Sequence, residues 1–301
     1  MTPSAPPGVI PFGADAPATF DPREPVGLLA CGGRFPIVFA EKARECGIPV
    51  VCVAVKGMAD PVLRDVCTEF TWLRRLSLAK TVRSFQRGGV RRWTMAGKFE
   101  KRVLLRPWWW FRFLPDWRIL RMWLSRRRRA NNDDSLLLDL IAEFRRDGLE
   151  CVSALDLCPE LLVKEGTLTR RRPSAAELLD IKIGWDLARE MGRLDVGQSV
   201  MIRARAVLAV EAVEGTDQAI ARAGELCRRG GFVVVKVAKP HQDKRFDVPT
   251  VGVQTIETMR AAGATALAIE AGRTILLDEA ETVARADRYG IAITSLVAPA
   301  V

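Results

Sequence analysis

The sequence predicts an α/β protein of two domains, the first Rossmann-like with a parallel βαβ sheet, the second a mixed sheet with flanking helices. The chain has 301 residues, 49% of them hydrophobic, which is enough for two cores without disulfides or a structural metal. Strand-like and helix-like segments alternate along it, as in α/β folds. A basic stretch containing proline, 169–174, predicts a hinge. We expect a disordered lead-in at 1–25, a first domain at 26–165 and a second at 166–301.

The first domain opens with an apolar strand, a glycine turn, a helix and a second strand. This order is how a parallel βαβ unit begins. Asn and Asp residues at 131–134 supply capping side chains for an amphipathic helix near the end of the domain. The segments expected are strands at 26–30, 49–55 and 92–95, and helices at 36–46, 78–87 and 135–146.

The second domain begins with Ser174 and Glu177, the spacing of a capping box, which predicts that a helix starts there. Apolar and β-branched runs follow, and Gly230-Gly231 ends a second helix. The segments expected are strands at 198–203, 206–213, 232–237, 266–269, 273–277 and 291–297, a helix at 217–227 and a last helix before the final strand.

The chain carries no sign of secretion or of membrane spans. Its seven cysteines are scattered and never in Cys-x-x-Cys spacing, which argues against a zinc ribbon and a disulfide framework and for a reducing compartment. The first residues are rich in Pro, Ala and Gly and lack the pattern of a secretory leader. No run of 18 charge-free apolar residues could span a membrane. We expect a cytoplasmic protein.

Positive charge is concentrated at residues 74–129, called the basic region below. It holds 18 Lys or Arg against two acids, although the net charge of the whole chain is only +10. Tryptophans stand among these cations, at 108–110 and at Trp117. Such a region can contact an anionic membrane surface, bind single-stranded nucleic acid, or be a helix with core tryptophans and solvated arginines. We favour membrane contact, and a non-enzymatic nucleotide- or nucleic-acid-binding protein is the alternative function.

The turn Cys31-Gly-Gly-Arg34 is a candidate phosphate-binding element. It precedes a helix, whose N-terminal N–H groups can receive an anion. It lacks the full Gly-x-Gly-x-x-Gly fingerprint, and no acid follows the next strand at the expected place. A plain tight turn is the alternative, and the motif alone slightly favours it.

The densest group of ionisable residues lies in the twelve positions 236–247. Carboxylates at Asp243 and Asp247 suit a hard divalent ion, which prefers oxygen ligands. The cations beside them suit a diphosphate. Glu214 and Asp217, at the start of an expected helix, form a second pair of carboxylates. A polar surface loop with internal ion pairs is the alternative, and His241, the only histidine, ranks below the aspartates.

Five segments in this order carry a family resemblance: 27–36, 95–97, 192–198, 214–217 and 235–252. Together they resemble the LpxI-type UDP-2,3-diacylglucosamine pyrophosphatases, over nearly the whole chain after residue 25. The last segment, with Gln242-Asp-Lys-Arg-Phe-Asp247, is the most specific. Two positions depart from the family pattern, since Cys31 stands at a glycine position and His241 replaces a small residue.

The resemblance implies a Mg²⁺- or Mn²⁺-dependent hydrolase of lipid A biosynthesis. Such an enzyme splits UDP-2,3-diacylglucosamine into UMP and 2,3-diacylglucosamine 1-phosphate by water attack on the β-phosphorus. The resemblance also implies a homodimer that works at the cytoplasmic surface of the inner membrane, with no nucleic-acid partner. The family's catalytic aspartate falls on Asp243 or Asp247, and we slightly favour Asp247.

These implications lead to three sets of site residues. The catalytic set is Asp247 and Asp243, with Lys236, Lys239 and Arg245 acting on the diphosphate. The metal set is Asp243, Asp247, Glu214 and Asp217. The substrate-binding set is Gly32, Gly33, Arg34, Gly97, Gln198, Thr216 and Gln242.

Overall fold

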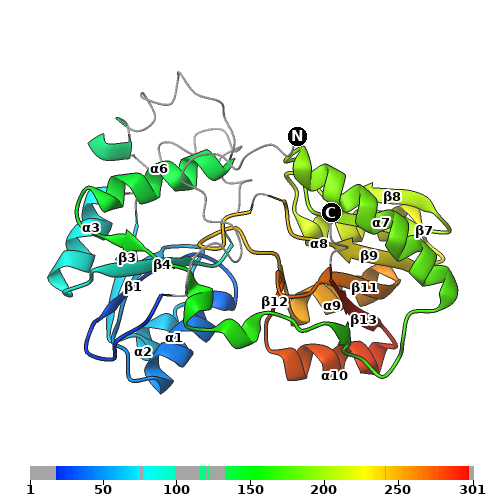
Figure 1. The fold of residues 1–301 in the computed structure, drawn as a ribbon, viewed down its shortest axis with the longest axis horizontal. Helices are drawn as coiled ribbons and strands as arrows, with labels where there is room; N and C mark the ends of the chain where they lie inside the picture. The colour runs from blue at the N-terminus through cyan, green and yellow to red at the C-terminus, as the bar shows by residue number, and fades with distance from the viewer. Residues whose placement is uncertain are drawn as a thin grey trace. The chain divides into compact units, whose positions relative to one another are not determined.

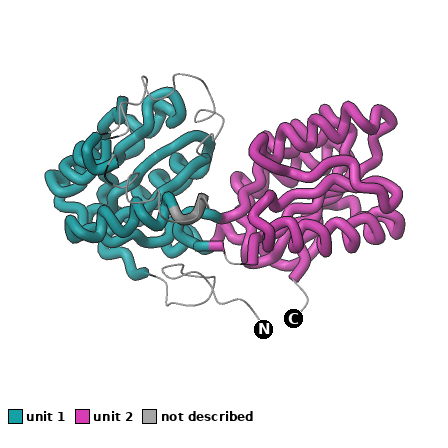
Figure 2. The backbone as a smooth tube through the Cα atoms, turned by 90° about the horizontal axis from the view of Figure 1, so that it is seen from above, with its two compact units in different colours: residues 1–159, 243–247 teal, residues 160–242, 248–301 magenta. Residues whose placement is uncertain are grey.

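The chain forms two compact units (Figure 2) in a computed structural model that describes residues 18–74, 77–98, 116–119, 121, 133–240 and 242–297. Unit 1 comprises residues 1–159 and 243–247, and unit 2 comprises 160–242 and 248–301. The first division thus falls six residues before the expected boundary at 165, and a short piece of the second half belongs to unit 1. Most of the lead-in, half of the basic region and His241 lie outside the described residues.

Unit 1 is built on a parallel five-stranded sheet in the order β3-β2-β1-β4-β5 (Figure 1). Its central strands are almost wholly buried and apolar, as expected for strands covered on both faces. The order reverses between β1 and β4, so their carboxyl ends form the switch point where α/β sheets commonly bind ligands. The strands are β1 (Val26–Ala30), β2 (Val50–Val55), β3 (Glu69–Leu73), β4 (Arg92–Ala96) and β5 (Glu150–Cys151).

Helices cover both faces of this sheet (Figure 1). Helices α1 (Phe35–Glu45) and α2 (Leu63–Val66) lie on one face, and α3 (Leu78–Arg87) and α6 (Asp133–Arg145) on the other. Under α3 and α6 the rings of Phe85, Trp93 and Phe144 pack with centroids 4.5–6.4 Å apart. Two short 3₁₀ helices, Ala154–Asp156 and Pro159–Leu161, lead out of the unit.

Unit 2 contains a mixed six-stranded sheet in the order β6-β13-β11-β9-β7-β8. Strands β9, β11 and β13 run parallel, and β6, β7 and β8 pair antiparallel at the two edges. A separate parallel pair joins β10 (Thr250–Val251) to β12 (Ile275–Leu276). The strands of the large sheet are β6 (Gly166–Thr167), β7 (Ser199–Arg203), β8 (Ala206–Val210), β9 (Phe232–Lys236), β11 (Ala264–Glu270) and β13 (Ala292–Leu296).

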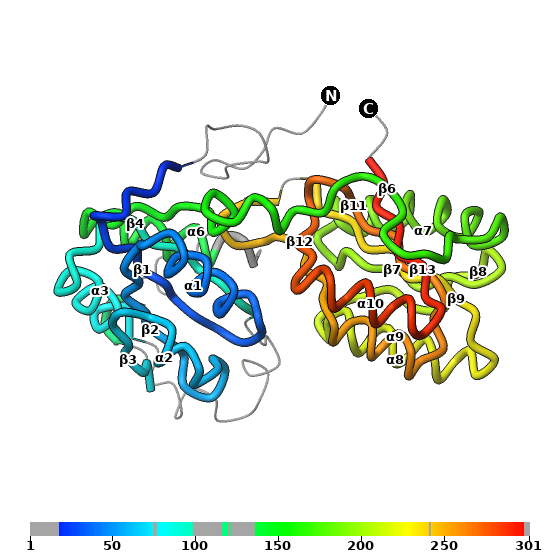
Figure 3. Tube along the Cα trace, turned by 90° about the horizontal axis from the view of Figure 1, so that it is seen from below, coloured from blue at the N-terminus to red at the C-terminus, as the bar shows by residue number. Residues whose placement is uncertain are grey.

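Helix α7 (Ala175–Arg193) covers one face of the sheet of unit 2, where Ile181, Trp185 and Ala188 meet its strands. Helices α8 (Thr216–Leu226), α9 (Val253–Ala262) and α10 (Glu279–Tyr289) lie side by side on the other face (Figure 3). The predicted capping box of α7 is present, because the Ser174 and Glu177 side chains each accept a backbone N–H of the other residue.

The predicted fold class is confirmed, with a parallel sheet in one unit and a mixed sheet with flanking helices in the other. The strand expected at 273–277 is reduced to β12 and belongs to the small sheet rather than the large one. Strand β3 and helix α9 were not expected from the sequence. No helix within the described ranges is both long and apolar enough to cross a membrane.

Candidate functional site

Gly32 and Gly97 lie against each other at the switch point of unit 1. Gly32 follows β1 and Gly97 follows β4, and Lys98 donates its N–H to the Gly32 carbonyl at 2.7 Å. Gly97 has φ +98°, and a Cβ there would lie 2.6 Å from the Gly32 oxygen, so only glycine fits. Two of the predicted substrate-binding glycines are therefore brought together at the carboxyl ends of the strands.

Gly33 and Arg34, from the same predicted set, line an open hollow of ≈ 510 Å³ beside this turn. The rest of its lining is Ile37 and residues 57–61. The Arg34 guanidinium pairs with Glu41 of α1 at 3.0 Å. The hollow thus combines a glycine turn, the start of a helix and a cation, features that suit an anionic group, with one acid, Asp60, also in its lining.

Two cysteines near the predicted site groups are protonated thiols at neutral pH. Burial raises the pKa of Cys31, in the glycine turn, to about 11. Burial likewise raises the pKa of Cys151, at the end of β5, to about 12. Neither has the low pKa of a nucleophilic thiolate.

Within unit 1, Asp243 and Arg245 form a buried ion pair. Asp243 is fully enclosed, and the Arg245 Nη2 and Nε atoms donate to its carboxylate at 2.6 and 2.9 Å. The Arg245 backbone N–H donates to the same carboxylate at 3.0 Å, and Asp247 donates its own N–H to the Asp243 carbonyl at 3.0 Å. The Ser153 hydroxyl holds the Lys244 carbonyl at 2.8 Å. Asp243 therefore secures the turn in which Asp247 lies.

Lys236 ends strand β9 in unit 2, and only 6% of it is exposed. Its Nζ donates to Thr216 Oγ1 at 3.1 Å and to the Thr250 carbonyl at 3.0 Å. Thr216 is the first residue of α8, and Gly215, with φ +84°, lets the chain turn into that helix. The buried ammonium group thus lies at the N-terminal end of a helix. Its positive charge and the partial positive charge of the helix N-terminus both favour binding of an anion.

Three more predicted residues meet in the loop after β9. Gln242 donates from Nε2 to Gln198 Oε1 at 3.2 Å and accepts the Lys239 N–H at 2.9 Å. The Lys239 ammonium pairs with Asp195 at 2.7 Å. Gln198, Lys239 and Gln242 therefore form one hydrogen-bonded group.

Among the charged residues in these contacts, Glu211, Glu270 and Arg273 were not predicted from the sequence. Glu211 accepts the Thr216 hydroxyl at 2.9 Å. Glu270 accepts the Ala238 N–H at 2.8 Å and Arg273 Nη1 at 3.1 Å, and Arg273 Nη2 donates to the Lys239 carbonyl at 3.1 Å. Glu211 follows β8 directly and Glu270 ends β11. Glu270 directly follows the strand expected at 266–269, and that position was a signal that could have revealed it. Glu211 lies inside the strand expected at 206–213, so its place at a strand end was not visible from the sequence.

The four carboxylates of the predicted metal set are divided between the units. Glu214 and Asp217 belong to unit 2, and Asp243 and Asp247 to unit 1. Although burial raises the pKa of Glu214, hydrogen bonds from its own backbone and from Arg222, at 2.6 Å, bring it below its ordinary value. In the part of the chain that the structure describes, no three Asp, Glu, His or Cys side chains are grouped as metal ligands.

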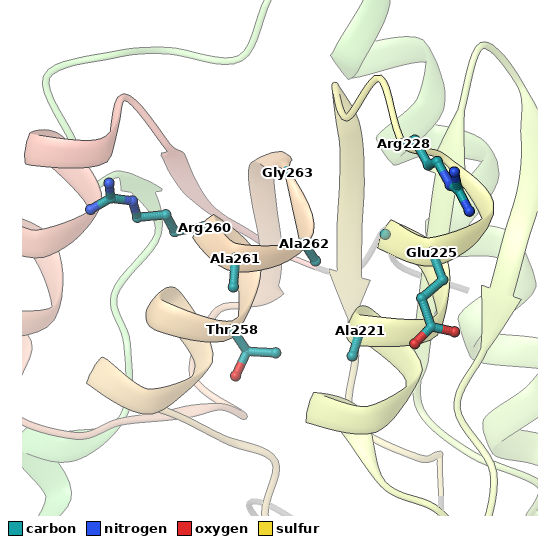
Figure 4. A pocket seen from close by; sticks show the side chains of 9 residues that line it. Ala221, Glu225, Arg228, Thr258, Arg260, Ala261, Ala262 and Gly263 are labelled. Carbon is teal, nitrogen blue, oxygen red and sulfur yellow. The ribbon is translucent and has the colours of Figure 1, made fainter.

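A second hollow, of ≈ 460 Å³, lies between α8 and α9 (Figure 4). Ala221, Thr258 and Ala262 face its interior, and Arg228 and Arg260 extend away from it on opposite sides. Arg260 stacks on the Tyr289 ring at 4.2 Å. Glu225 and Gly263 also line this groove, and it contains none of the residues predicted for the site.

Comparison with known proteins covers both units. The model of the LpxI N-terminal domain matches residues 25–161, and that of the LpxI C-terminal domain matches 164–294. A curated protein of Caulobacter vibrioides, UDP-2,3-diacylglucosamine pyrophosphatase LpxI, is 32% identical over 274 residues. The match spans 88% of this chain and 95% of that relative.

Proposed function

The chain belongs to the LpxI family, and from this we propose that it is a pyrophosphatase that hydrolyses UDP-2,3-diacylglucosamine in lipid A biosynthesis. Water attacks the β-phosphorus, and the oxygen that bridged the two phosphorus atoms leaves with UMP. The other product is 2,3-diacylglucosamine 1-phosphate.

The observation that carries this proposal is the buried ammonium of Lys236. A lysine side chain is rarely buried to this extent. Here a hydroxyl and a carbonyl oxygen hold Nζ at 3.1 and 3.0 Å, at the start of α8. A fixed cation beside a helix N-terminus suits the charge that a diphosphate carries and that grows on its oxygens during hydrolysis.

The roles follow from these surroundings. Lys236 and Lys239 act on the diphosphate, and the Gly32–Gly97 turn with Gly33 and Arg34 receives another anionic or polar part of the substrate. Arg245 is engaged by Asp243, so this pair fixes the turn rather than reacting. Asp247 then orients the attacking water and takes its proton.

We propose that Mg²⁺ or Mn²⁺ is required and arrives with the substrate. Asp243 is occupied by Arg245 and Glu214 by Arg222, so the residues do not fit a resident ion held by four carboxylates. They do fit an ion held by Asp247 and the diphosphate, because Mg²⁺ is commonly bound by one or two carboxylates and substrate phosphates. Such an ion would polarise phosphate oxygens and lower the pKa of the attacking water.

We further propose that the protein works in the cytoplasm as a homodimer at the inner-membrane surface. The substrate carries two acyl chains, and the basic region has the composition of a membrane-contacting surface. Trp117, one of its described residues, is 71% exposed. If the protein contacts the membrane, it should bind anionic vesicles, and the binding should weaken as salt is added. Light scattering of the purified protein would test whether it is a dimer.

The decisive experiment measures UMP release from UDP-2,3-diacylglucosamine with Mg²⁺ and with a chelator. Turnover only with the metal ion supports the proposal. UDP-N-acetylglucosamine, which lacks the ester-linked acyl chain and has only a short N-acyl group, tests the requirement for lipid. A wild-type protein that is inert with every divalent ion would overturn the proposal, and salt-sensitive binding of single-stranded nucleic acid would then favour the non-enzymatic alternative.

A further inference from the structure

Glu211, directly after β8, is a buried carboxylate that no part of the proposed reaction yet uses. It is only 9% exposed. Its Oε1 accepts the Thr216 hydroxyl at 2.9 Å, and its Oε2 is buried without a hydrogen-bond partner among the described residues. A carboxylate in such surroundings is unfavourable for folding by itself. The burial of this carboxylate is therefore not explained by a contribution to stability.

Thr216 connects Glu211 to Lys236. The Lys236 ammonium can only donate, and a carboxylate can only accept. The threonine hydroxyl has one proton, and both contacts involve its oxygen, at 3.1 Å from Nζ and 2.9 Å from Oε1. The threonine must therefore accept from Lys236 and donate to Glu211, so the direction of each hydrogen bond is fixed.

The backbone holds Glu211 firmly in this place. Its N–H donates to the Ser199 carbonyl at 2.8 Å. Gly197 packs so closely that a Cβ there would lie 2.0 Å from the Glu211 carbonyl oxygen. Ser199, fully buried, also brings its hydroxyl within 3.5 Å of Thr216 Oγ1. The carboxylate is thus aimed at Thr216 by the ends of two paired strands.

We infer that Glu211 is a positioning residue which, through Thr216, orients the Lys236 ammonium for the diphosphate. This inference rests on the proposed function, because Lys236 is assigned there to the substrate. Glu211 itself touches neither the diphosphate nor the attacking water. Its negative charge and the fixed hydroxyl keep the ammonium in one direction, which matters most when charge grows on the phosphate oxygens.

The test compares Glu211→Gln with Glu177→Gln. Glu177 is a matched control, since it is also a buried acid of unit 2 that accepts a threonine hydroxyl, that of Thr265 at 2.6 Å, but it caps α7. For Glu211→Gln we expect kcat to fall roughly tenfold and KM to rise, with the melting temperature little changed. For Glu177→Gln we expect the melting temperature to fall and kcat to stay.

A double-mutant cycle with Thr216→Val shows whether the effect passes through the threonine. If it does, adding Glu211→Gln to Thr216→Val lowers kcat no further, and Thr216→Ser restores the wild-type response to Glu211→Gln. Additive losses, or a loss of kcat that only follows a loss of folded protein, would overturn the inference while wild-type turnover leaves the proposed function standing.

UDP binding, measured by calorimetry, provides a readout that does not need turnover. Glu211→Gln should weaken it and Glu177→Gln should not. If the wild type does not hydrolyse the substrate but the two variants still differ in this way, the proposed function fails and the positioning of Lys236 stands. Equal UDP affinities in wild type and Glu211→Gln would count against the inference.

Discussion

Asp243 and Asp247 lie four positions apart in one turn, but their surroundings differ. Asp243 is enclosed and accepts three hydrogen bonds from Arg245 at 3.0 Å or less. Removing one partner of a buried ion pair leaves the other charge uncompensated, which costs more than the pair contributes. The two aspartates should therefore respond differently to the loss of charge.

We predict that Asp243→Asn lowers the free energy of unfolding by about 3–5 kcal/mol. Asp247→Asn should change it by less than about 1 kcal/mol while abolishing UMP release. Denaturant unfolding and the UMP assay on the same preparations check both statements. If Asp243→Asn were stable but inactive and Asp247→Asn were active, Asp243 would be the residue that orients the water and Asp247 would not.

The close approach of Gly97 to Gly32 allows a second prediction. Gly47→Ala should cost about 1–2 kcal/mol, since its φ is +72° and nothing lies within 4 Å of the new Cβ. Gly97→Ala should cost more, because a backbone oxygen at 2.6 Å must also move. It should weaken UDP binding as well, and calorimetry with thermal melts on both variants measures the difference. Equal losses of stability in the two variants would mean that the backbone around Gly97 moves aside at little cost.

At the scale of elements, the sequence predicted most of the segments whose pattern is local. Helix α7 was predicted from its capping box, and β2 and β9 from dense apolar runs. Strand β3 was missed because it is a half-exposed edge strand that begins with Glu69, and α9 because Gly252 gives it no capping side chain.

The candidate site was predictable in residue type but not in partners. Lys236 and Thr216 were identified, but Glu211, which joins Thr216, was not. These contacts join residues at the ends of β8 and β9, which lie close together because of the strand order of the sheet. The spacing of residues along the chain does not reveal the strand order. That Asp243 and Glu214 belong to different units was hidden for the same reason.

Helix α7 carries a prediction about pH. Burial raises the pKa of Glu177, but hydrogen bonds from Thr265, Ser174 and Arg171 outweigh it, so the pKa lies below its ordinary value of 4.5. A carboxylate with a lowered pKa stabilises the fold above pH 4.5 and loses that effect as the pH falls through its folded-state pKa. The stability difference between wild type and Glu177→Gln should therefore shrink on acidification, as measured by denaturant unfolding. A difference that is constant with pH would contradict this account.

At the scale of the molecule, the notable feature is that residues 243–247 complete unit 1 (Figure 2). Phe246 packs there against the core that contains Phe85 and Trp93. A side chain from the second half of the sequence thus stabilises the sheet formed by the first half.

We predict that Phe246→Ala destabilises unit 1 by about 2 kcal/mol, less than for a fully buried phenylalanine because Phe246 is only partly buried. Amide hydrogen exchange should speed up in β1 and β2 and stay unchanged in β9 and β11. Leu226→Ala, at a position that is 65% exposed, serves as the control. Faster exchange in both units would show that they unfold as one.

The same division sets the order of events on the ribosome. The first part of unit 1 ends at residue 159, and its last piece begins at 243, 84 residues later. At about 5–20 residues per second, the emerging chain waits roughly 4–17 s for that piece, with the place of Phe246 still open. Residues 243–247 interrupt the part of the chain that forms unit 2, so they become available to join unit 1 before the synthesis of unit 2 is complete. A gene cut at the apparent domain boundary would therefore yield a first half that lacks part of its own core.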